Sequence, residues 1–548
     1  MSNGIKSLWI IFVALLLSAI IIFVYKPNET NLPSETFDPT QATTEMINRG
    51  QEIAKGYCQS CHRFPDPNLL SKDIWISQTL PAMGPLLGVF EYNGREYPYS
   101  KSEHTPAGYY PKYAMLSLDD WNALLNFYYH NAPDSLPVST GHRKIEIDQL
   151  FFKPSVPNYT SQTPPTATAA KLDSKNKHIY VSDVDGSTLL IFDQELNLEQ
   201  SLVQSETISD IEFLNPAAEP GPRNLLISYL GSLVPSDAPD GHLLETSYNP
   251  APGPGSRPGL NIIIDDLVRP VETRHGDLND DGYHDLLVSE FGHLKGSLFW
   301  LEGDSNGTFK ASKNIILNNP GCIQSSILDY TNDGLTDIVA LCTQANQSLY
   351  LFEGSGDGNF ERRTLLEFSL TAGSSSFQLH DFNNDGYQDI LYTSGDNADF
   401  SIAYKPYHGV YIYLNDGNDN FSKEWFYPMN GAYDARVADF NGDGLTDIAA
   451  ISFFGDYLNR PEEGFLLFLS DSNPDDTITF TPYNIPETQN GRWIAMDVAD
   501  WTGNGLDDIL LSNYSLGPDV EPEQAQMDDV FKQGPLFLLL ENMGTVEN

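Results

Sequence analysis

The chain has 548 residues, enough for a small domain and a large one, and 75 acidic against 30 basic residues give a net charge of −45. This charge argues against nucleic acid and anionic membrane surfaces as partners, and favours cations, basic proteins or neutral substrates. Residues 1–137 contain 9 Lys/Arg and 13 Asp/Glu, so residues 138–548 carry about −41 of the total.

Residues 8–25 form an uncharged apolar run of 18 residues, long enough to cross a bilayer as a helix. Lys6 precedes the run, so residues 1–7 are expected in the cytoplasm. A cleaved signal peptide is the alternative, but the run exceeds a usual signal-peptide core and no small-x-small site follows it directly. The sequence therefore predicts an uncleaved transmembrane anchor, a Pro/Thr/Asn/Glu-rich linker over residues 26–44, and a periplasmic or otherwise extracytoplasmic remainder.

The motif Cys58-Gln-Ser-Cys61-His62 is typical of c-type haem attachment, in which two thiols bond the haem vinyl groups and the histidine ligates iron. A redox Cys-x-x-Cys would need a βαβ context, and a zinc site would need a second Cys/His pair. The sequence shows neither. Residues 45–55 and 119–129 are predicted helices on either side of the motif. We therefore expect one covalent haem c.

Residues 45–137 resemble a class I cytochrome c domain, on the haem motif and its two flanking helices. Such domains cross their first and last helices, and Gly50, eight residues before the first cysteine, fits the small residue at that crossing. Residues 119–129, with Ser117 as the N-cap, fit the last helix.

The sixth iron ligand stays open between two methionines. Met83 lies in a Leu-Pro-Ala-Met-Gly-Pro run that resembles a recurrent segment of haem domains fused to propellers. Met83 is therefore the preferred ligand. Met115 is closer to the final helix, where class I cytochromes usually place this residue, and His104 is a third candidate. Ordinary core packing is the alternative role for either methionine.

A nine-residue pattern with oxygen side chains at positions 1, 3, 5 and 9 and glycine at position 6 occurs five times. Such a set suits Ca²⁺, position 7 can add its carbonyl, and the glycine permits the sharp turn. An EF-hand would need glutamate at position 12, where these copies have residues of an apolar strand. A single copy could be a plain turn, but five in register favour about five calcium sites. The predicted ligands are Asp277, Asn279, Asp281, Asp285, Asp329, Thr331, Asp333, Asp337, Asp381, Asn383, Asp385, Asp389, Asp439, Asn441, Asp443, Asp447, Asp500, Thr502, Asn504 and Asp508.

The spacing of the pattern predicts the architecture. Its first aspartates lie 52, 52, 58 and 61 residues apart, and each period contains four short strand-like runs. Four strands in about 50 residues are typical of a β-propeller blade. Two blades without the pattern are predicted upstream, over residues 166–203 and from residue 208. The chain is thus expected to be mainly β, with a seven-bladed propeller over residues 138–548.

These repeats resemble the FG-GAP/VCBS repeats of integrin-α-type propellers, on the nine-residue loop and on the G-x-F turns at Gly307 and Gly358. The resemblance implies calcium between the first two strands of a blade and a role in recognition or assembly. Cys322 and Cys342 flank the second loop, and either a disulfide or two buried thiols fits them. Residues 144–152 alternate apolar and polar, and are predicted to supply the outer strand of the last blade, which lacks its own.

No nucleophile elbow, phosphate loop or zinc-protease helix is present in the sequence. Polar and aromatic residues just before the loops could meet at one mouth of the propeller's central channel and form a substrate site. The alternative is that they make purely structural contacts. They are Glu272, Arg274, His275, Gln378, Asp434, Arg436, Arg492 and Trp493.

The predicted function is electron transfer by a membrane-anchored monohaem cytochrome c, an electron carrier rather than a self-contained enzyme. Its propeller would recognise a redox partner protein or an extracellular ligand. Two alternatives stay open: a calcium-stabilised adhesion or assembly platform with an accessory haem, and an oxidoreductase with a substrate site at the channel mouth.

Overall fold

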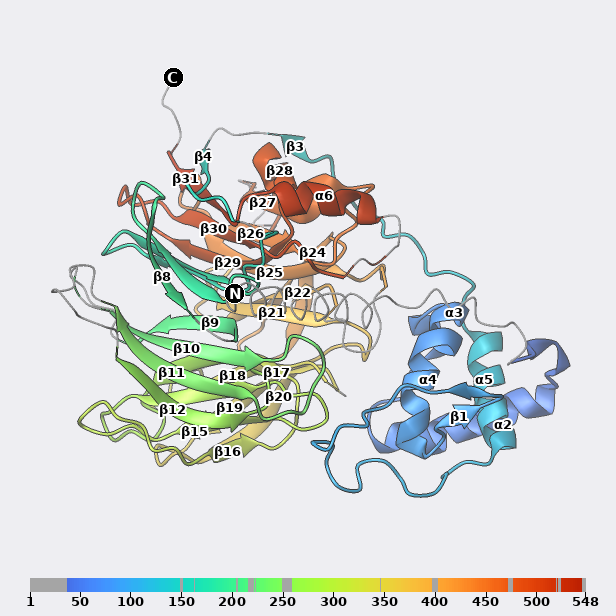
Figure 1. The fold of residues 1–548 in the computed structure, drawn as a ribbon. Coiled ribbons are helices and arrows are strands. Elements are labelled where there is room, and N and C mark those ends of the chain that lie inside the picture. The colour runs from blue at the N-terminus through green and yellow to red at the C-terminus, as the bar shows by residue number, and fades with distance from the viewer. Residues whose placement is uncertain are drawn as a thin grey trace, which may run out of the picture.

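The computed structural model shows a small helical domain beside a large ring of sheets (Figure 1). The predicted anchor at residues 8–25 lies outside the described residues, and among those described no helix is long and apolar enough to cross a membrane. The described residues are 37–147, 151–161, 163–203, 206–214, 221, 223–248, 259–344, 346–396, 403–471, 477–518, 520 and 524–544.

The helical domain, residues 37–137, is built around two long helices. Thr43 caps the first, its Oγ1 accepting from Met46 N at 3.2 Å, and Ser117 caps the last, accepting from Asp120 N at 3.1 Å. The elements are η1 Pro39–Gln41, α2 Thr44–Tyr57, η2 Cys58–Ser60, η3 Pro67–Leu69, α3 Lys72–Ile74, the π-helical turn η4 Trp75–Thr79, α4 Leu80–Met83, η5 Gly84–Leu87, β1 Glu91–Tyr92, β2 Arg95–Glu96 and α5 Leu118–Asn131.

Helices α2 and α5 cross at Gly50. A Cβ atom there would lie 2.1 Å from the carbonyl oxygen of Ala123, so the helices approach this closely because the side chain is absent. Trp121 and Tyr128 of α5 are fully buried below the crossing, and Tyr128 Oη donates to Pro65 O at 2.9 Å. The crossing that the cytochrome resemblance implies for Gly50 is thus present as a feature of the fold.

The described part of residues 138–548 forms a ring of seven sheets, each built on four antiparallel strands, which confirms the predicted propeller. First strands of neighbouring sheets contact one another, so they are innermost. In chain order, blade one is β5 Ala170–Asp173, β6 His178–Asp183, β7 Thr188–Phe192 and β8 Leu198–Val203; blade two is β9 Thr207–Phe213, β10 Arg223–Gly231, β11 Gly241–Tyr248 and β12 Leu260–Leu267; blade three is β13 Pro270–Gly276, β14 Asp285–Glu290, β15 Ser297–Leu301 and β16 Asn314–Leu317; blade four is β17 Cys322–Leu328, β18 Asp337–Cys342, β19 Ser348–Gly354 and β20 Phe360–Glu367. Blade five is β21 Ser374–His380, β22 Asp389–Ser394, β23 Gly409–Asn415 and β24 Phe421–Pro428; blade six is β25 Ala432–Ala438, β26 Asp447–Ser452, β27 Phe465–Ser470 and β28 Phe480–Asn484; blade seven is β29 Trp493–Ala499, β30 Asp508–Asn513 and β31 Phe537–Asn542 with β4 Phe152–Ser155.

The ring closes with an N-terminal strand, but not with the whole predicted segment. β4 pairs antiparallel with β31 as the outer strand of blade seven, whereas β3 (Glu146–Ile147) pairs parallel with β28 of blade six. The prediction of one strand over residues 144–152 was therefore wrong. The physical reason is that its apolar residues are divided between two hydrophobic clusters, with Ile145 against blades five and six and Phe152 between blades six and seven.

Cys322 and Cys342 form a disulfide between β17 and β18, where they are direct partners in the ladder with Cα atoms 3.8 Å apart. The alternative of two free thiols is thereby excluded.

The alternating strand directions place the loops on two faces of the ring. The nine-residue loops join first to second strands and lie on one face; the connections between second and third strands and between blades lie on the other, here called the connector face. The connector face carries the longer insertions η6 (Pro461–Gly464), η7 (Pro486–Asn490) and α6 (Ala525–Gln533).

Candidate functional sites

The two cysteines of the haem motif lie one 3₁₀ turn apart at the end of α2. Cys61 N donates to Cys58 O at 3.5 Å, and side chains three residues apart in such a turn share a face. Both thiols are free; Cys61 is exposed, while burial raises the pKa of the Cys58 thiol to about 11. The turn thus presents two unpaired thiols side by side.

His62 is held in one tautomer. Its Nδ1 lies 2.7 Å from the carbonyl oxygen of Arg63, which can only accept, so the proton is on Nδ1. Nε2 then has the lone pair that a metal needs.

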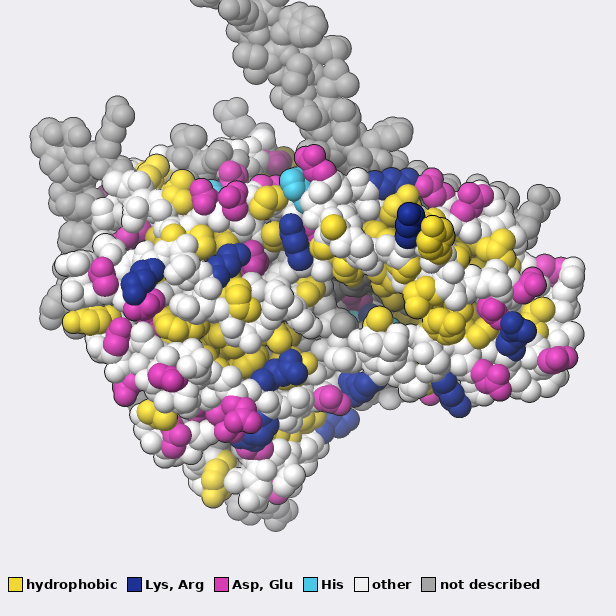
Figure 2. All heavy atoms as spheres, turned by 90° about the horizontal axis from the view of Figure 1, so that it is seen from below, with side chains coloured by type: hydrophobic (Ala, Val, Ile, Leu, Met, Phe, Trp, Pro, Cys, Tyr) yellow, Lys and Arg dark blue, Asp and Glu magenta, His cyan; other side chains and the backbone are white. Residues whose placement is uncertain are grey.

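The surroundings fit a covalently attached haem. Several apolar side chains pack against the domain core but are only partly buried, so they leave apolar surface that a porphyrin face could cover; they include Tyr57, Phe64, Leu69, Ile74, Ile76 and Leu87. Figure 2 shows hydrophobic side chains gathered on the helical domain beside a hollow at its junction with the propeller. Paired thiols, an available imidazole nitrogen and an apolar face are the features that haem attachment needs.

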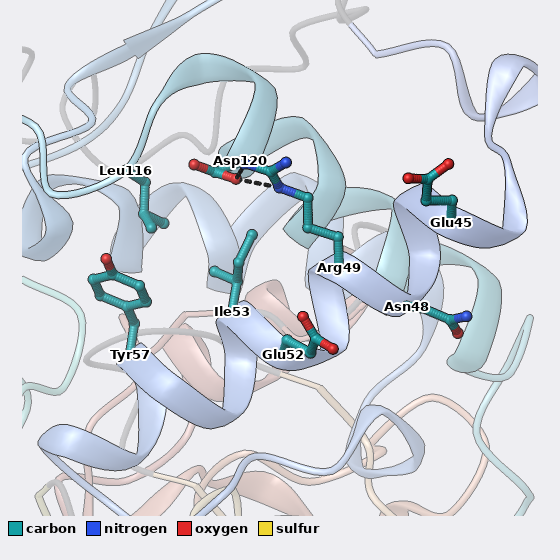
Figure 3. A pocket seen from close by; sticks show the side chains of 8 residues that line it. All are labelled: Glu45, Asn48, Arg49, Glu52, Ile53, Tyr57, Leu116 and Asp120. Carbon is teal, nitrogen blue, oxygen red and sulfur yellow. Dashed lines mark hydrogen bonds and ion pairs between the residues drawn. The ribbon is translucent and has the colours of Figure 1, made fainter.

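An open pocket of about 810 Å³ lies on the outer side of α2 (Figure 3). Ile53, Tyr57 and Leu116 form its apolar end, and Tyr57 directly precedes Cys58. Beside them Arg49 Nε donates to Asp120 Oδ1 at 2.5 Å, an ion pair that ties α2 to the start of α5, and Glu45 and Asn48 lie at the other end (Figure 3).

The three candidates for the sixth ligand have different settings. Met83 ends α4, which runs directly into η5, and it is half-buried. Met115 is 50% exposed in the segment before α5, and its backbone N–H donates to Leu87 O at 2.9 Å. His104 lies in a loop, 3.8 Å from Glu103. The preference for Met83 stays a prediction.

In the nine-residue loops, the last aspartate has a structural role that the sequence reasoning missed. Asp285 is fully buried; its Oδ2 accepts from Leu278 N at 2.9 Å and its Oδ1 from Gly303 N at 2.8 Å. Each position-9 carboxylate therefore ties its own loop to the end of the blade's third strand. Asp337, Asp389 and Asp447 repeat both contacts, and Asp508 differs only in accepting from Thr502 N, one residue later in its loop. Burial raises the pKa of Asp447 to about 7. The signal available in the sequence for this structural role was that position 9 is aspartate in all five copies.

Side chains at positions 1, 3 and 5 are more exposed and are arranged by backbone N–H groups. Asp381, at position 1, accepts from Asp385 N at 3.1 Å and from Gly386 N at 2.8 Å. Among the described residues no group of three or more His, Cys, Asp or Glu is arranged to hold a metal. The donor set of Asp, Asn and Thr oxygens nevertheless fits a hard cation chemically.

Several polar side chains on the inner strands join neighbouring blades. Glu272 Oε2 accepts from Ser325 N at 2.6 Å, Gln378 Oε1 from Val437 N at 3.0 Å, and Asp210 Oδ2 from Thr273 N at 3.0 Å. Bonds of this kind between adjacent first strands are the purely structural contacts that the sequence left open as the alternative to a substrate site.

Arg274 is the centre of an ionic cluster, at 2.6 Å from Glu272, 3.2 Å from Asp210 and 3.7 Å from Glu212. Lys171 joins it, 3.6 Å from Glu212. Sequence reasoning missed Lys171, Asp210 and Glu212 because their blades lack the nine-residue pattern.

The remaining residues of this set do not face one mouth together. Arg436 pairs with Asp434 at 3.0 Å. Trp493 is fully buried and donates to Thr488 O at 2.7 Å, and Arg492 is buried against Tyr457. His275 lies beside His284, with ring centroids 5.2 Å apart.

A family model described as an FG-GAP-like repeat matches residues 277–340, 329–392 and 396–450. No curated protein matches this chain. Similar solved structures include Saccharomyces cerevisiae Sqt1, with 8% identity, 70% of this chain and 98% of that chain covered, and a TM-score of 0.38. Hydrazine synthase of Kuenenia stuttgartiensis has 10% identity, 65% and 95% coverage, and a TM-score of 0.37. The large domain is thus a seven-bladed β-propeller whose central blades carry FG-GAP-like repeats.

Proposed function

We propose that the chain is a membrane-anchored, extracytoplasmic electron-transfer protein with one covalent haem c and a propeller that recognises its redox partner. The observation that carries the proposal is the pair of free thiols one turn apart, followed by His62 with its proton on Nδ1. The channel side chains are engaged between blades, so no substrate site is proposed there.

In this proposal each residue of the motif has a separate task. Cys58 and Cys61 hold the group covalently, His62 binds the iron through Nε2, and Met83 is the sixth ligand. The haem supplies one-electron chemistry. The half-buried apolar residues beside the motif exclude water, and the Arg63 carbonyl keeps the His62 ring in its orientation.

Haem attachment is tested by producing the protein together with the factors that attach c-type haem. The purified chain should gain the mass of one haem and keep its colour after denaturation. Replacing Cys58 and Cys61 with serine should abolish both signals, while Ser60→Ala, between them, should leave both intact. A chain without covalent haem would overturn the proposal.

The sixth ligand is tested by spectroscopy. The reduced protein should show the narrow α-band of a low-spin haem. Met83→Ala should remove the methionine–iron charge-transfer band of the oxidised protein, whereas Met115→Ala and His104→Ala should leave it. Loss of the band only in Met115→Ala would reassign the ligand.

The calcium part of the proposal assigns about five ions to the nine-residue loops, where they would stiffen the propeller. Chelation should lower its melting temperature and leave the haem spectrum unchanged. The Asp500 loop should bind most weakly, because Asn504 replaces a carboxylate and its amide nitrogen donates to Asn542 O at 2.6 Å. Equal affinities in a calorimetric titration would contradict that ranking.

A further inference from the structure

Arg63, the residue that follows the haem motif, contacts the propeller. Arg63 Nη1 donates to Glu367 Oε2 at 3.0 Å, Nη2 donates to Phe368 O, and Arg63 N donates to Asn346 Oδ1 at 3.2 Å. These partners lie at the end of β20 and in the β18–β19 connection, on the connector face. One arginine thus contacts two connections of blade four, directly next to His62.

A second contact follows seven residues after the motif. Tyr407 Oη lies 3.5 Å from Leu69 O and also donates to Thr371 O at 3.2 Å. Its loop is anchored by an ion pair between Lys405 and Asp396, 2.7 Å apart and almost fully buried. The blade-five side of the junction is therefore held by a buried charge pair.

Blade four is also firmly packed at its contact point. Phe368, whose carbonyl accepts from Arg63, stacks on Tyr392 with parallel rings and centroids 3.9 Å apart. Because the ring is buried between blades four and five, the carbonyl is fixed relative to the propeller core.

A third region brings the helical domain near blade two. Burial raises the pKa of Tyr109, and the charges of Asp237 in the β10–β11 connection and of Cys61 contribute to the rise. Asp237 is itself buried and accepts from Leu294 N at 2.8 Å and Lys295 N at 3.0 Å. The side chain of Tyr109 is therefore within electrostatic range of both the propeller and the haem motif.

We propose that the propeller forms one wall of the haem site, and that Arg63 is the positioning residue that holds the haem-bearing turn against it. Printed hydrogen bonds hold the turn and the segment after it against blades four and five, and the hollow in Figure 2 lies at this junction. The inference rests on the proposed function, since it concerns the setting of the haem. It assigns the propeller a direct part in controlling which oxidants reach that haem.

The charges at the junction allow a sharp test. Arg63 is 43% exposed and Glu367 52%, so their ion pair alone is weak, and removing either residue should let the junction open part of the time. Opening should speed oxidation of the reduced haem by any small oxidant. Loss of charge alone should instead slow the oxidation, provided that the oxidant has a charge opposite in sign to the one removed.

For Arg63→Ala the oxidant is the anion ferricyanide, and for Glu367→Gln it is the cation tris(phenanthroline)cobalt(III). Losing a positive charge slows an anion and losing a negative charge slows a cation, whereas opening predicts acceleration, about threefold or more, in both cases. Arg63→Lys should fall between wild type and alanine, because an ammonium lacks the fork that reaches Glu367 and Phe368 together. Slower or unchanged oxidation in both variants would overturn the proposal.

Lys101→Ala is the matched control, since it removes a positive charge from the same domain at an exposed pair whose partner, Glu96, belongs to the helical domain itself. It should slow ferricyanide slightly. The rate of backbone hydrogen exchange in peptides containing Asn346 and Glu367 can be measured without haem. Arg63→Ala should increase this rate. A protein without haem but with this increase would reject the proposed function and keep the junction; unchanged exchange would reject the junction.

Discussion

The helical domain and the propeller are stabilised in different ways. The helical domain has a single hydrophobic cluster, organised by the crossing of α2 and α5 at Gly50. In the described part of the propeller there are seven clusters, each formed by side chains of two neighbouring blades. The core of the propeller therefore lies between blades, and every blade depends on both neighbours.

This difference explains where the buried polar groups are. In the propeller they join elements across an interface, as Glu272 does between blades three and four, or fix a loop to a strand, as Asp285 does. In the helical domain, buried polar groups such as the Trp121 indole, which donates to Tyr97 Oη at 2.9 Å, connect short local elements. Local damage should therefore stay local in the helical domain and spread in the ring.

The largest effect should come from opening the ring at its closing strand. Phe152 of β4 is 4% exposed and packs between blades six and seven, with its ring 6.1 Å from that of Phe440. Phe152→Ala should reduce the free energy of unfolding of the propeller by about 3–5 kcal/mol. Thermal unfolding followed by circular dichroism measures this.

Val156→Ala, at a half-exposed position after the same strand, is the control and should have little effect. A Phe152→Ala protein with the wild-type melting temperature would show that the ring does not depend on this strand.

Repeated residues made the ring predictable, because strands, turns and the nine-residue loop recur with a period that only a blade explains. The candidate haem motif was equally local, since Cys58, Cys61 and His62 are adjacent in sequence. Contacts between distant segments were not predictable: Arg63 meets partners 283 to 305 residues away, with no pattern to announce them. The closing segment was misassigned for a related reason, because alternation shows that residues pair but not with which blade.

The crossing in the helical domain should tolerate no side chain. Gly50→Leu places a Cβ within 2.1 Å of a carbonyl oxygen of α5, so we expect a loss of about 3 kcal/mol confined to this domain. Haem incorporation should fall sharply while the melting temperature of the propeller stays unchanged. Gly56→Leu, where a Cβ would meet nothing within 4 Å, is the matched control. A destabilised propeller in Gly50→Leu would contradict the view that the two domains are stabilised by separate hydrophobic cores.

The disulfide should contribute a similar amount. It joins β17 and β18 across a separation of 20 residues, and closing such a loop stabilises the folded state by about 3 kcal/mol in the chain-entropy model. Replacing Cys322 and Cys342 together with serine should lower the propeller's melting temperature and leave the haem domain intact. If the double variant melts like wild type, the disulfide has no role in holding blade four.

The smallest effect concerns the charge between blades three and four. Burial raises the pKa of Glu272 to about 7, although Arg274 beside it favours the ionised form. A carboxyl whose folded pKa is raised binds its proton more tightly in the folded than in the unfolded state. Its contribution to stability is therefore present at low pH and is lost as pH rises from its ordinary range through 7. Glu272→Gln removes this dependence but keeps an oxygen to accept from Ser325 N.

Relative to Glu272→Gln, the wild-type propeller should therefore lose stability between pH 5 and pH 8, on the order of 2 kcal/mol. The difference in melting temperature between the two proteins at each pH measures this and cancels the other titrating groups. Glu361→Gln, at an exposed position of β20, should show no such trend. A wild-type advantage that grows with pH would mean that Arg274 outweighs burial and keeps Glu272 ionised. The interface between blades three and four would then be held by an ion pair, rather than by a carboxyl that is partly protonated near neutral pH.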